Sequence, residues 1–189
     1  MKNKFKETEK GFALPLALLL LVVMTIMGVT LVTISSNEHN ANNDKDSNQQ
    51  VFYAAESGIS VAKSWMVGNI SKFSSSPPNN LDSKLRFCKA SFFPNLRSSN
   101  NGFHSERKTL NQVISASGDE ATRLGKFSFE YFIAYTPDQN GNNSSGKKKS
   151  GTNNILYTVY SCGCDAAANS CIPQNNVIVP LEAVVTLVN

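Results

Sequence analysis

The sequence has few of the side chains that enzymes use for proton transfer and nucleophilic attack. It contains two histidines, His39 and His104, and His39 lies far along the chain from any acidic pair in the C-terminal region. There is no nucleophile elbow, no glycine-rich phosphate loop and no paired-carboxylate site. We therefore expect no enzymatic activity, no cofactor and no resident metal.

The sequence also lacks a strong excess of charge of either sign. Lysine and arginine number 18 against 14 aspartate and glutamate residues, a net charge of +4. Part of this excess belongs to residues 1–11, which hold four lysines and two glutamates. The remainder is close to neutral and gives no electrostatic reason to expect tight binding to nucleic acid. The run Lys147–Lys149 is interpreted as a solvated loop, with contact to DNA or an anionic surface as the alternative.

Charge is absent altogether from residues 12–34, a run of 23 residues. As a helix this run would be about 35 Å long, enough to cross a hydrocarbon core of about 30 Å. A cleaved signal peptide usually has a shorter apolar region followed by a small-x-small site, which this sequence does not offer. We expect a retained membrane helix, and the lysines before it predict that residues 1–11 stay in the cytoplasm while residues 36–189 lie outside.

Pro15 indicates where this helix starts. A proline in a helix interior costs about 3 kcal/mol, because it lacks an N–H and clashes with the preceding turn. The first four N–H groups of a helix have no internal partner, so a proline among them costs little. Pro15 therefore favours a helix that starts at Phe12, directly after Gly11.

The junction between Gly11 and Phe12 resembles the class III signal of type IV prepilins, in which a short charged leader ends in glycine and is followed by phenylalanine and a long apolar run. The resemblance implies that a membrane prepilin peptidase cuts between the two residues and that Phe12 is then N-methylated. It also implies that the apolar helix is retained, first as an anchor and later within a filament core. The alternative is a plain single-pass anchor.

Leu16 departs from the pattern of major pilins. Those subunits usually carry glutamate at this fifth mature position, where it pairs with the terminal amine of a neighbouring subunit. Leucine avoids a charge that would be costly in lipid, and it also removes the docking contact to an earlier subunit. Together with the resemblance, Leu16 implies a minor, initiating or tip-proximal subunit.

Two periodicities describe the rest of the chain. Residues 51–66 carry an apolar stripe at helical spacing, so the simplest assembly is one long helix from Phe12 to about Val67. The opposite side of the stripe offers Glu56, Ser60 and Lys63. The stripe comprises Val51, Phe52, Ala55, Gly58, Ile59, Ala62, Trp65 and Met66.

Residues 126–135, 154–162 and 176–188 alternate as strands do, and Pro180 places the last of them at an edge or a bulge. Residues 136–153 are expected to form a long loop, and residues 81–118 show no clear pattern. The sequence therefore predicts an α+β fold. In it a long N-terminal helix, with a transmembrane half and an amphipathic half, packs on a C-terminal antiparallel sheet of three or more strands.

More specifically, "VFYAAESGISVA", "KFSFEYFIAY" and "YTVYSCG…VPLEAVVTLV" resemble the helix segment, the first strand and the last two strands of PilX-type minor pilins. The resemblance covers residues 11–67 and 126–188 and implies a pilin-like fold.

Four cysteines lie in the region expected outside the cytoplasm, which predicts two disulfides. Within one strand, Cys162 and Cys164 point the same way at about 6–7 Å spacing, and a bond between them would close a strained loop. We prefer Cys164–Cys171 with Cys88–Cys162, and Cys162–Cys171 with Cys88–Cys164 stays open. A zinc site made of these cysteines is a weaker alternative, because exported thiolates usually oxidise.

We therefore expect a minor pilin, held in the inner membrane with its head in the periplasm and later part of a cell-surface pilus that serves adhesion and twitching motility. The resemblance implies as partners other minor and major pilins, the prepilin peptidase and the inner-membrane assembly platform, with a tip adhesin as a further candidate. A pseudopilin of a type II secretion tip, a membrane-anchored extracytoplasmic binding domain and a secreted enzyme are the alternatives. The expected parts are a cleaved leader at 1–11, a transmembrane and filament-core helix at 12–36, a periplasmic amphipathic helix at 37–67, and a globular head at 68–189 with its sheet at 126–188.

Overall fold

The computed structural model describes residues 13–74, 81, 84–96, 102–138, 140, 146–148, 150–151 and 154–187. By their contacts the residues form two compact units, Met1–Asp46 and Ser47–Asn189. The predicted α+β fold is confirmed, because a long helix is followed by an antiparallel sheet and its last turns pack on that sheet.

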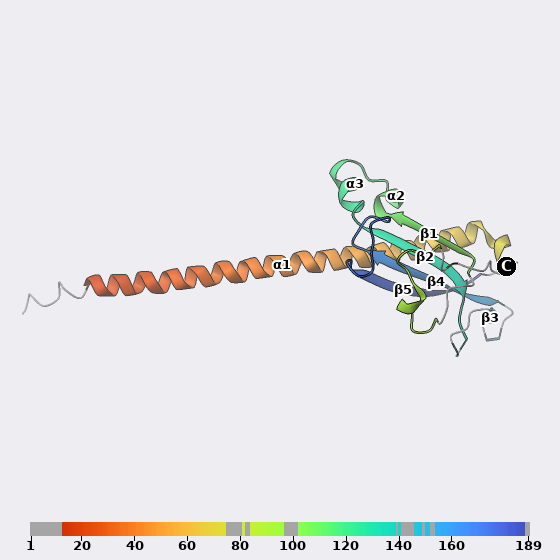
Figure 1. The fold of residues 1–189 in the computed structure, drawn as a ribbon, viewed down its shortest axis with the longest axis horizontal. Coiled ribbons are helices and arrows are strands. Elements are labelled where there is room, and N and C mark those ends of the chain that lie inside the picture. The colour runs from red at the N-terminus through yellow and green to blue at the C-terminus, as the bar shows by residue number, and fades with distance from the viewer. Residues whose placement is uncertain are drawn as a thin grey trace, which may run out of the picture. The chain divides into compact units, whose positions relative to one another are not determined.

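Helix α1 runs from Ala13 to Gly68 (Figure 1). The prediction of one helix reaching about Val67 is confirmed at this end, whereas Phe12 lies outside the described residues. The asparagine-rich residues 35–50 are helical although their intrinsic propensity is low. Extending an existing helix costs less free energy than nucleating a new one. Residues 35–50 are therefore helical because the apolar segments on both sides of them are helical.

The part of α1 that belongs to the second unit buries the predicted apolar stripe. Phe52 was assigned to this stripe but is 39% exposed, and Ala54 is buried in its place. Glu56 is exposed on the polar side, as expected. The fully buried members of the predicted stripe that have side-chain carbons are Val51, Ala55, Ala62 and Met66.

The sheet is an antiparallel meander of four long strands with one short addition. In space the long strands follow the order β1, β2, β4 and β5 (Figure 1). The expected succession of three strands is confirmed as β2, β4 and β5, and Pro180 lies in β5, which pairs with β4 alone among the described strands. The bounds are β1 His104–Thr109, β2 Ser128–Tyr135, β4 Ile155–Cys164 and β5 Ile178–Thr186.

Two regions differ from their sequence-based interpretation. The stretch at 136–153 is not loop throughout, because strand β3, Lys147–Lys148, pairs with the start of β4. The region without a clear pattern, 81–118, contains β1 at one edge of the sheet, paired with β2. It also holds the helices η2 Ala90–Phe92 and α2 Leu110–Val113, and α3 Gly118–Leu124 begins at its last residue, while η1 Ile70–Ser74 follows α1.

Both faces of the central strands are buried, so the second unit has three layers. Phe129, Tyr131 and Ile133 of β2 face the core that contains Ala62 and Met66 of α1. Their neighbours Phe132 and Ala134 belong to a second core on the opposite face. Residues 84–96 supply Leu85, Phe87 and Phe93 to this second core. A strand buried on both faces carries apolar residues at nearly every position, as "FSFEYFIAY" does.

Helix α1 lies unusually close to β4, and two glycines make this approach possible. A Cβ at Gly163 of β4 would overlap the carbonyl oxygen of Val51, and one at Gly58 of α1 would overlap Oγ of Ser161. Oγ of Ser161 donates to the carbonyl oxygen of Ala55 over 2.8 Å, a hydrogen bond that needs this proximity.

Replacing Gly163 with alanine is therefore expected to lower the free energy of unfolding by about 1–3 kcal/mol, because the helix backbone must move away from the sheet. Gly68→Ala is the matched control, since a Cβ there meets nothing within 4 Å, and we expect it to be neutral or slightly stabilising. Urea denaturation of both variants measures the difference. Equal stability of the two would show that the helix does not approach the strand this closely.

Candidate functional site

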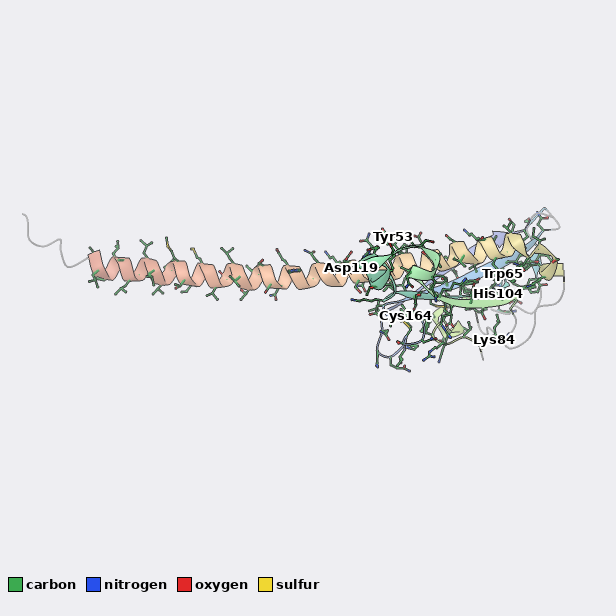
Figure 2. The ribbon with its side chains drawn as sticks, turned by 90° about the horizontal axis from the view of Figure 1, so that it is seen from above. Tyr53, Trp65, Lys84, His104, Asp119 and Cys164 are labelled. Atoms are coloured by element: carbon green, nitrogen blue, oxygen red, sulfur yellow. A yellow bond between two sulfur atoms is a disulfide. The ribbon has the colours of Figure 1, made fainter. Side chains whose placement is uncertain are left out.

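Residues 13–34 of α1, in the first unit, form an apolar helical segment whose side chains are exposed. From Leu14 to Ile34 its large apolar side chains are 41–70% exposed, and they stand out on all sides of α1 (Figure 2). The segment Ala13–His39, 27 residues with a mean hydropathy of 2.7 in its most apolar window, is long and apolar enough to cross a membrane. This surface is the principal candidate for function.

The polar side chains in this segment satisfy their own hydrogen bonds. Oγ1 of Thr25, Thr30 and Thr33 each donates to the carbonyl oxygen three residues earlier, over 2.8 Å. A hydroxyl paired within its own helix does not need water and is tolerated in lipid. Gly28 has nothing within 4 Å of an added Cβ, so another helix can approach its backbone closely.

The residues of the expected processing site are only partly described. Gly11 and Phe12 lie outside the described residues. Pro15 lies in the first turn of α1 as described, where its missing N–H costs little. Leu16 is 53% exposed and presents an apolar side chain on the surface of α1.

The cysteines form two disulfides, Cys88–Cys162 and Cys164–Cys171, with Cα atoms 5.3 Å and 6.4 Å apart. This is the pairing that the sequence analysis preferred. All four thiols are used, so none is free to act as a zinc ligand. The first bridge ties residues 84–96 to the sheet, and the second closes the connection between β4 and β5.

A buried carboxylate that the sequence analysis missed holds the same segment. Glu130 of β2 is 2% exposed, and its oxygens accept hydrogen bonds from the backbone N–H groups of Arg86, Phe87 and Cys88 at 2.7–3.0 Å. Nη1 of Arg107 lies 3.4 Å from Oε1 and completes the arrangement. The sequence did contain a signal for this site, a single glutamate within the aromatic run "FSFEYF". A charged side chain in a buried strand needs a hydrogen-bonding or charged partner, so this glutamate predicts one.

An aromatic and cationic cluster joins the end of α1 to β1. The rings of Trp65 and His104 stack at 4.0 Å with 2° between their planes, and Figure 2 shows the two side chains together. Nζ of Lys72 lies 5.2 Å from the Trp65 ring centre, a cation–π distance. Nε2 of His104 is buried and has no hydrogen-bond partner among the described residues.

The surroundings of His104 favour its neutral form. Burial lowers the pKa of its imidazole, opposed by Glu106, while Lys72, Lys108 and Lys84 lower it further. Glu106 itself is held ionised. Burial raises the pKa of its carboxyl, but hydrogen bonds from Lys108 and Tyr131 outweigh burial and leave the pKa lowered. The hydroxyl of Tyr131 donates to Oε2 of Glu106 over 3.0 Å.

These shifts predict a pH dependence of stability. Because the pKa of His104 is lower in the folded than in the unfolded chain, its contribution is complete above the unfolded pKa of about 6.5 and is lost as the pH falls through the folded value. We expect the free energy of unfolding to decrease below about pH 6.5, and His104→Phe, which keeps the stack, to remove this part of the decrease. Urea denaturation over a pH series, followed by the fluorescence of the single Trp65, measures it. A pH profile of His104→Phe equal to that of the wild type would contradict the prediction.

The other candidate residues from the sequence do not form a metal or catalytic site among the described residues. The described residues contain no group of three or more His, Cys, Asp or Glu side chains placed to hold a metal ion. Lys147 is an exposed residue of β3, and Lys149 lies outside the described residues. Glu56 is exposed on α1.

Comparison of the chain with protein-family models, with curated proteins and with solved structures found no match.

Proposed function

We propose that this chain is a minor pilin, a structural subunit that initiates a type IV pilus or lies near its tip. The observation that carries the proposal is the apolar segment 13–34 of α1, exposed at every large side chain, directly after a Gly–Phe junction in a lysine-bearing leader. A helix that is apolar on all sides needs lipid or other helices around it. A helix of this kind, followed by a disulfide-bonded head that contains an antiparallel sheet, is compatible with a pilin.

In the proposed mechanism the segment serves twice. It first anchors the subunit in the inner membrane, with the leader in the cytoplasm and the head outside. When the assembly machinery extracts the subunit, packing against neighbouring helices replaces the lipid. Burial of apolar surface contributes about 25 cal/mol per Å², so long contacts between helices offset a large cost of extraction. Gly28 and the internally bonded threonines allow such close contacts.

Leu16 supports the assignment to a minor subunit. A subunit that joins a growing filament in the major-pilin manner needs a carboxylate at this position to meet the amine of the subunit before it. A subunit that starts the filament has no predecessor and does without the carboxylate. Its partners are then the minor and major pilins that follow it, the assembly platform, the prepilin peptidase and, as a further candidate, a tip adhesin.

The proposal is tested at the N-terminus of the mature protein. Mass spectrometry of membrane fractions, with and without the prepilin peptidase, is expected to find N-methylated Phe12 only when the peptidase is present. A Gly11→Val substitution should leave the leader attached and abolish assembly, whereas the matched Gly28→Val substitution within the apolar helix should leave cleavage intact. An intact Met1 in the wild-type protein, or a cut beyond residue 34, would contradict the proposal.

The related alternative, a pseudopilin of a type II secretion tip, shares the same processing. Deletion of the chain distinguishes the two. Loss of surface pili with normal protein secretion supports the pilus, and the reverse result supports the secretion apparatus.

A further inference from the structure

The last strand of the sheet, β5, leaves one of its edges unpaired. It lies at the end of the strand order and pairs with β4 alone among the described strands (Figure 1). The backbone of Ile178–Thr186 makes no hydrogen bond outside its ladder with β4 to any described residue. One row of its N–H and C=O groups therefore lacks a partner in the part of the chain that the structure describes.

The ladder register decides which residues of β5 carry these outward groups. The N–H of Thr136, at the end of β2, donates to the carbonyl oxygen of Leu156, so the backbone of Leu156 and of every second residue after it faces β2. The residues between them face β5. One of these, Val159, pairs with Ala183, so the backbone of Ala183 faces β4 and that of its two neighbours faces outward. The outward-facing residues of β5 are Ile178, Pro180, Glu182, Val184 and Thr186.

The position of Pro180 agrees with this assignment. A proline has no N–H to donate to a ladder and is tolerated in an edge strand where its nitrogen faces away from the sheet. Because Pro180 belongs to the outward-facing set, β5 keeps every N–H that β4 needs. The proline removes one outward donor, so a further strand would pair mainly with residues 182–186.

The opposite edge of the sheet, β1, is protected against pairing and β5 is less so. The six residues of β1 include Glu106, Arg107 and Lys108, and charged side chains discourage the pairing of edge strands. The nine residues of β5 include one charged side chain, Glu182, and Val184 is 59% exposed. A long edge strand with so little charge is a predicted site of strand pairing.

The side chains of β5 indicate what an incoming strand carries. Val185 packs against the core that α1 covers, and Leu181 and Ala183 lie on the same face of the strand and are half-buried. Glu182 and Val184 are exposed on the other face. Neighbours on adjacent strands share a face and interact. The incoming strand should therefore carry apolar residues on the face nearer α1 and a lysine or arginine opposite Glu182.

A second copy of β5 fits this edge poorly. Antiparallel self-pairing centred on Glu182 sets two carboxylates opposite each other, which is destabilising. Centred on Leu181, it places Pro180, which has no N–H, opposite Glu182. Centred on Ala183, it places the same proline opposite Thr186. A different polypeptide can supply a complementary residue at each of these positions.

We propose that the outer edge of β5 accepts an extended segment of a different polypeptide as a further antiparallel strand. In this mode of recognition the backbone hydrogen bonds supply affinity and the alternating side chains supply specificity. Antiparallel pairing continues the pattern of the sheet and is slightly more stable per residue than parallel pairing. The inference does not depend on the filament assignment, since it concerns residues of the second unit alone.

The probe for the test is a dye-labelled peptide as long as β5, nine residues, in which valine alternates with threonine and lysine. Fluorescence anisotropy with the full chain in detergent micelles is expected to show saturable binding. A peptide of the same composition without the alternation should not bind. Val184→Pro removes an outward N–H but keeps the ladder with β4, and it should weaken binding about tenfold or more. Val184→Thr keeps the N–H and should change the affinity far less.

Ser105→Pro is the matched control on the opposite edge. Leu110 donates its N–H to the carbonyl oxygen of Phe127, so alternate residues of β1 face β2 and Ser105 faces outward. Removing its N–H should leave the affinity for the peptide unchanged.

Amide hydrogen exchange of the wild-type chain provides a readout that needs no variant. Bound peptide is expected to slow exchange at the outward-facing Glu182, Val184 and Thr186. Exchange at Ala183 and Val185, which already bond to β4, should change little.

The proposal would be overturned by the absence of saturable binding, by an affinity unchanged in Val184→Pro, or by an equal loss in Ser105→Pro. Slowed exchange without the alternation between outward-facing and inward-facing residues would overturn it as well. Sedimentation that shows a dimer of the chain, lost in Val184→Pro, would identify the occupant as a second copy and contradict the proposed partner.

Discussion

Replacing Glu130 with alanine is expected to lower the free energy of unfolding by about 3–5 kcal/mol. The substitution leaves the backbone N–H groups of Arg86, Phe87 and Cys88 without their acceptor. Two of these residues are fully buried, and a buried donor left unpaired costs about 1–3 kcal/mol. The positive charge of Arg107, 28% exposed, keeps access to water and contributes less to the loss.

The measurement is urea denaturation of the full chain in detergent, followed by the fluorescence of Trp65. Glu182→Ala is the control, because it removes the same carboxylate from the exposed surface of the same sheet and should change stability by less than about 0.5 kcal/mol. The loss of stability for Glu130→Gln should lie between those of Glu130→Ala and Glu182→Ala, since the remaining amide oxygen can still accept a hydrogen bond from residues 86–88. A loss for Glu130→Ala that is no larger than the control would show that the carboxylate does not hold residues 86–88.

The elements that could be predicted from the sequence are those whose pattern is local. Residues 51–66 repeat apolar side chains at helical spacing, and β2, β4 and β5 alternate, so each carries its own signal. The misassigned Phe52 shows the limit of this reasoning. Phe52 lies beside the stripe and is 39% exposed, whereas Ala54, which the predicted stripe did not include, is buried in the core that faces the sheet.

Residues 84–96 and β1 could not be predicted, because long-range contacts hold them in place. Strand β1, "HSERKT", has no apolar alternation and is defined by its pairing with β2. Residues 84–96 have little regular structure. Their position is fixed by Glu130 and Cys162, which are both distant from them in sequence. Among the candidate site residues, the apolar helix and the cysteines were visible in the sequence. The role of the buried Glu130 was not, since its hydrogen-bond partners in residues 86–88 lie far along the chain.

Glu130 and the Cys88–Cys162 disulfide hold the same residues, so their effects should not add. Cys162 is the register partner of Glu130 on the neighbouring strand, and Cys88 donates its N–H to the carboxylate over 2.8 Å. When either the Glu130 carboxylate or the disulfide is removed, residues 86–88 are already held less firmly to the sheet. Removing both should therefore cost less than the sum of the single losses, as expected for residues that share a partner.

Removing the Cys88–Cys162 disulfide by substituting both cysteines with alanine is expected to lower the free energy of unfolding by about 4 kcal/mol. The bridge spans 74 residues, so in the unfolded chain it restricts many conformations. The Cys164–Cys171 bridge spans 7 residues, and the same substitution there should cost only about 2 kcal/mol. This second variant is the matched control, since each variant removes one disulfide and all four cysteines belong to the same buried core. Equal losses for the two variants, measured by urea denaturation under oxidising conditions, would contradict the view that the longer bridge stabilises the head more because it restricts more of the unfolded chain.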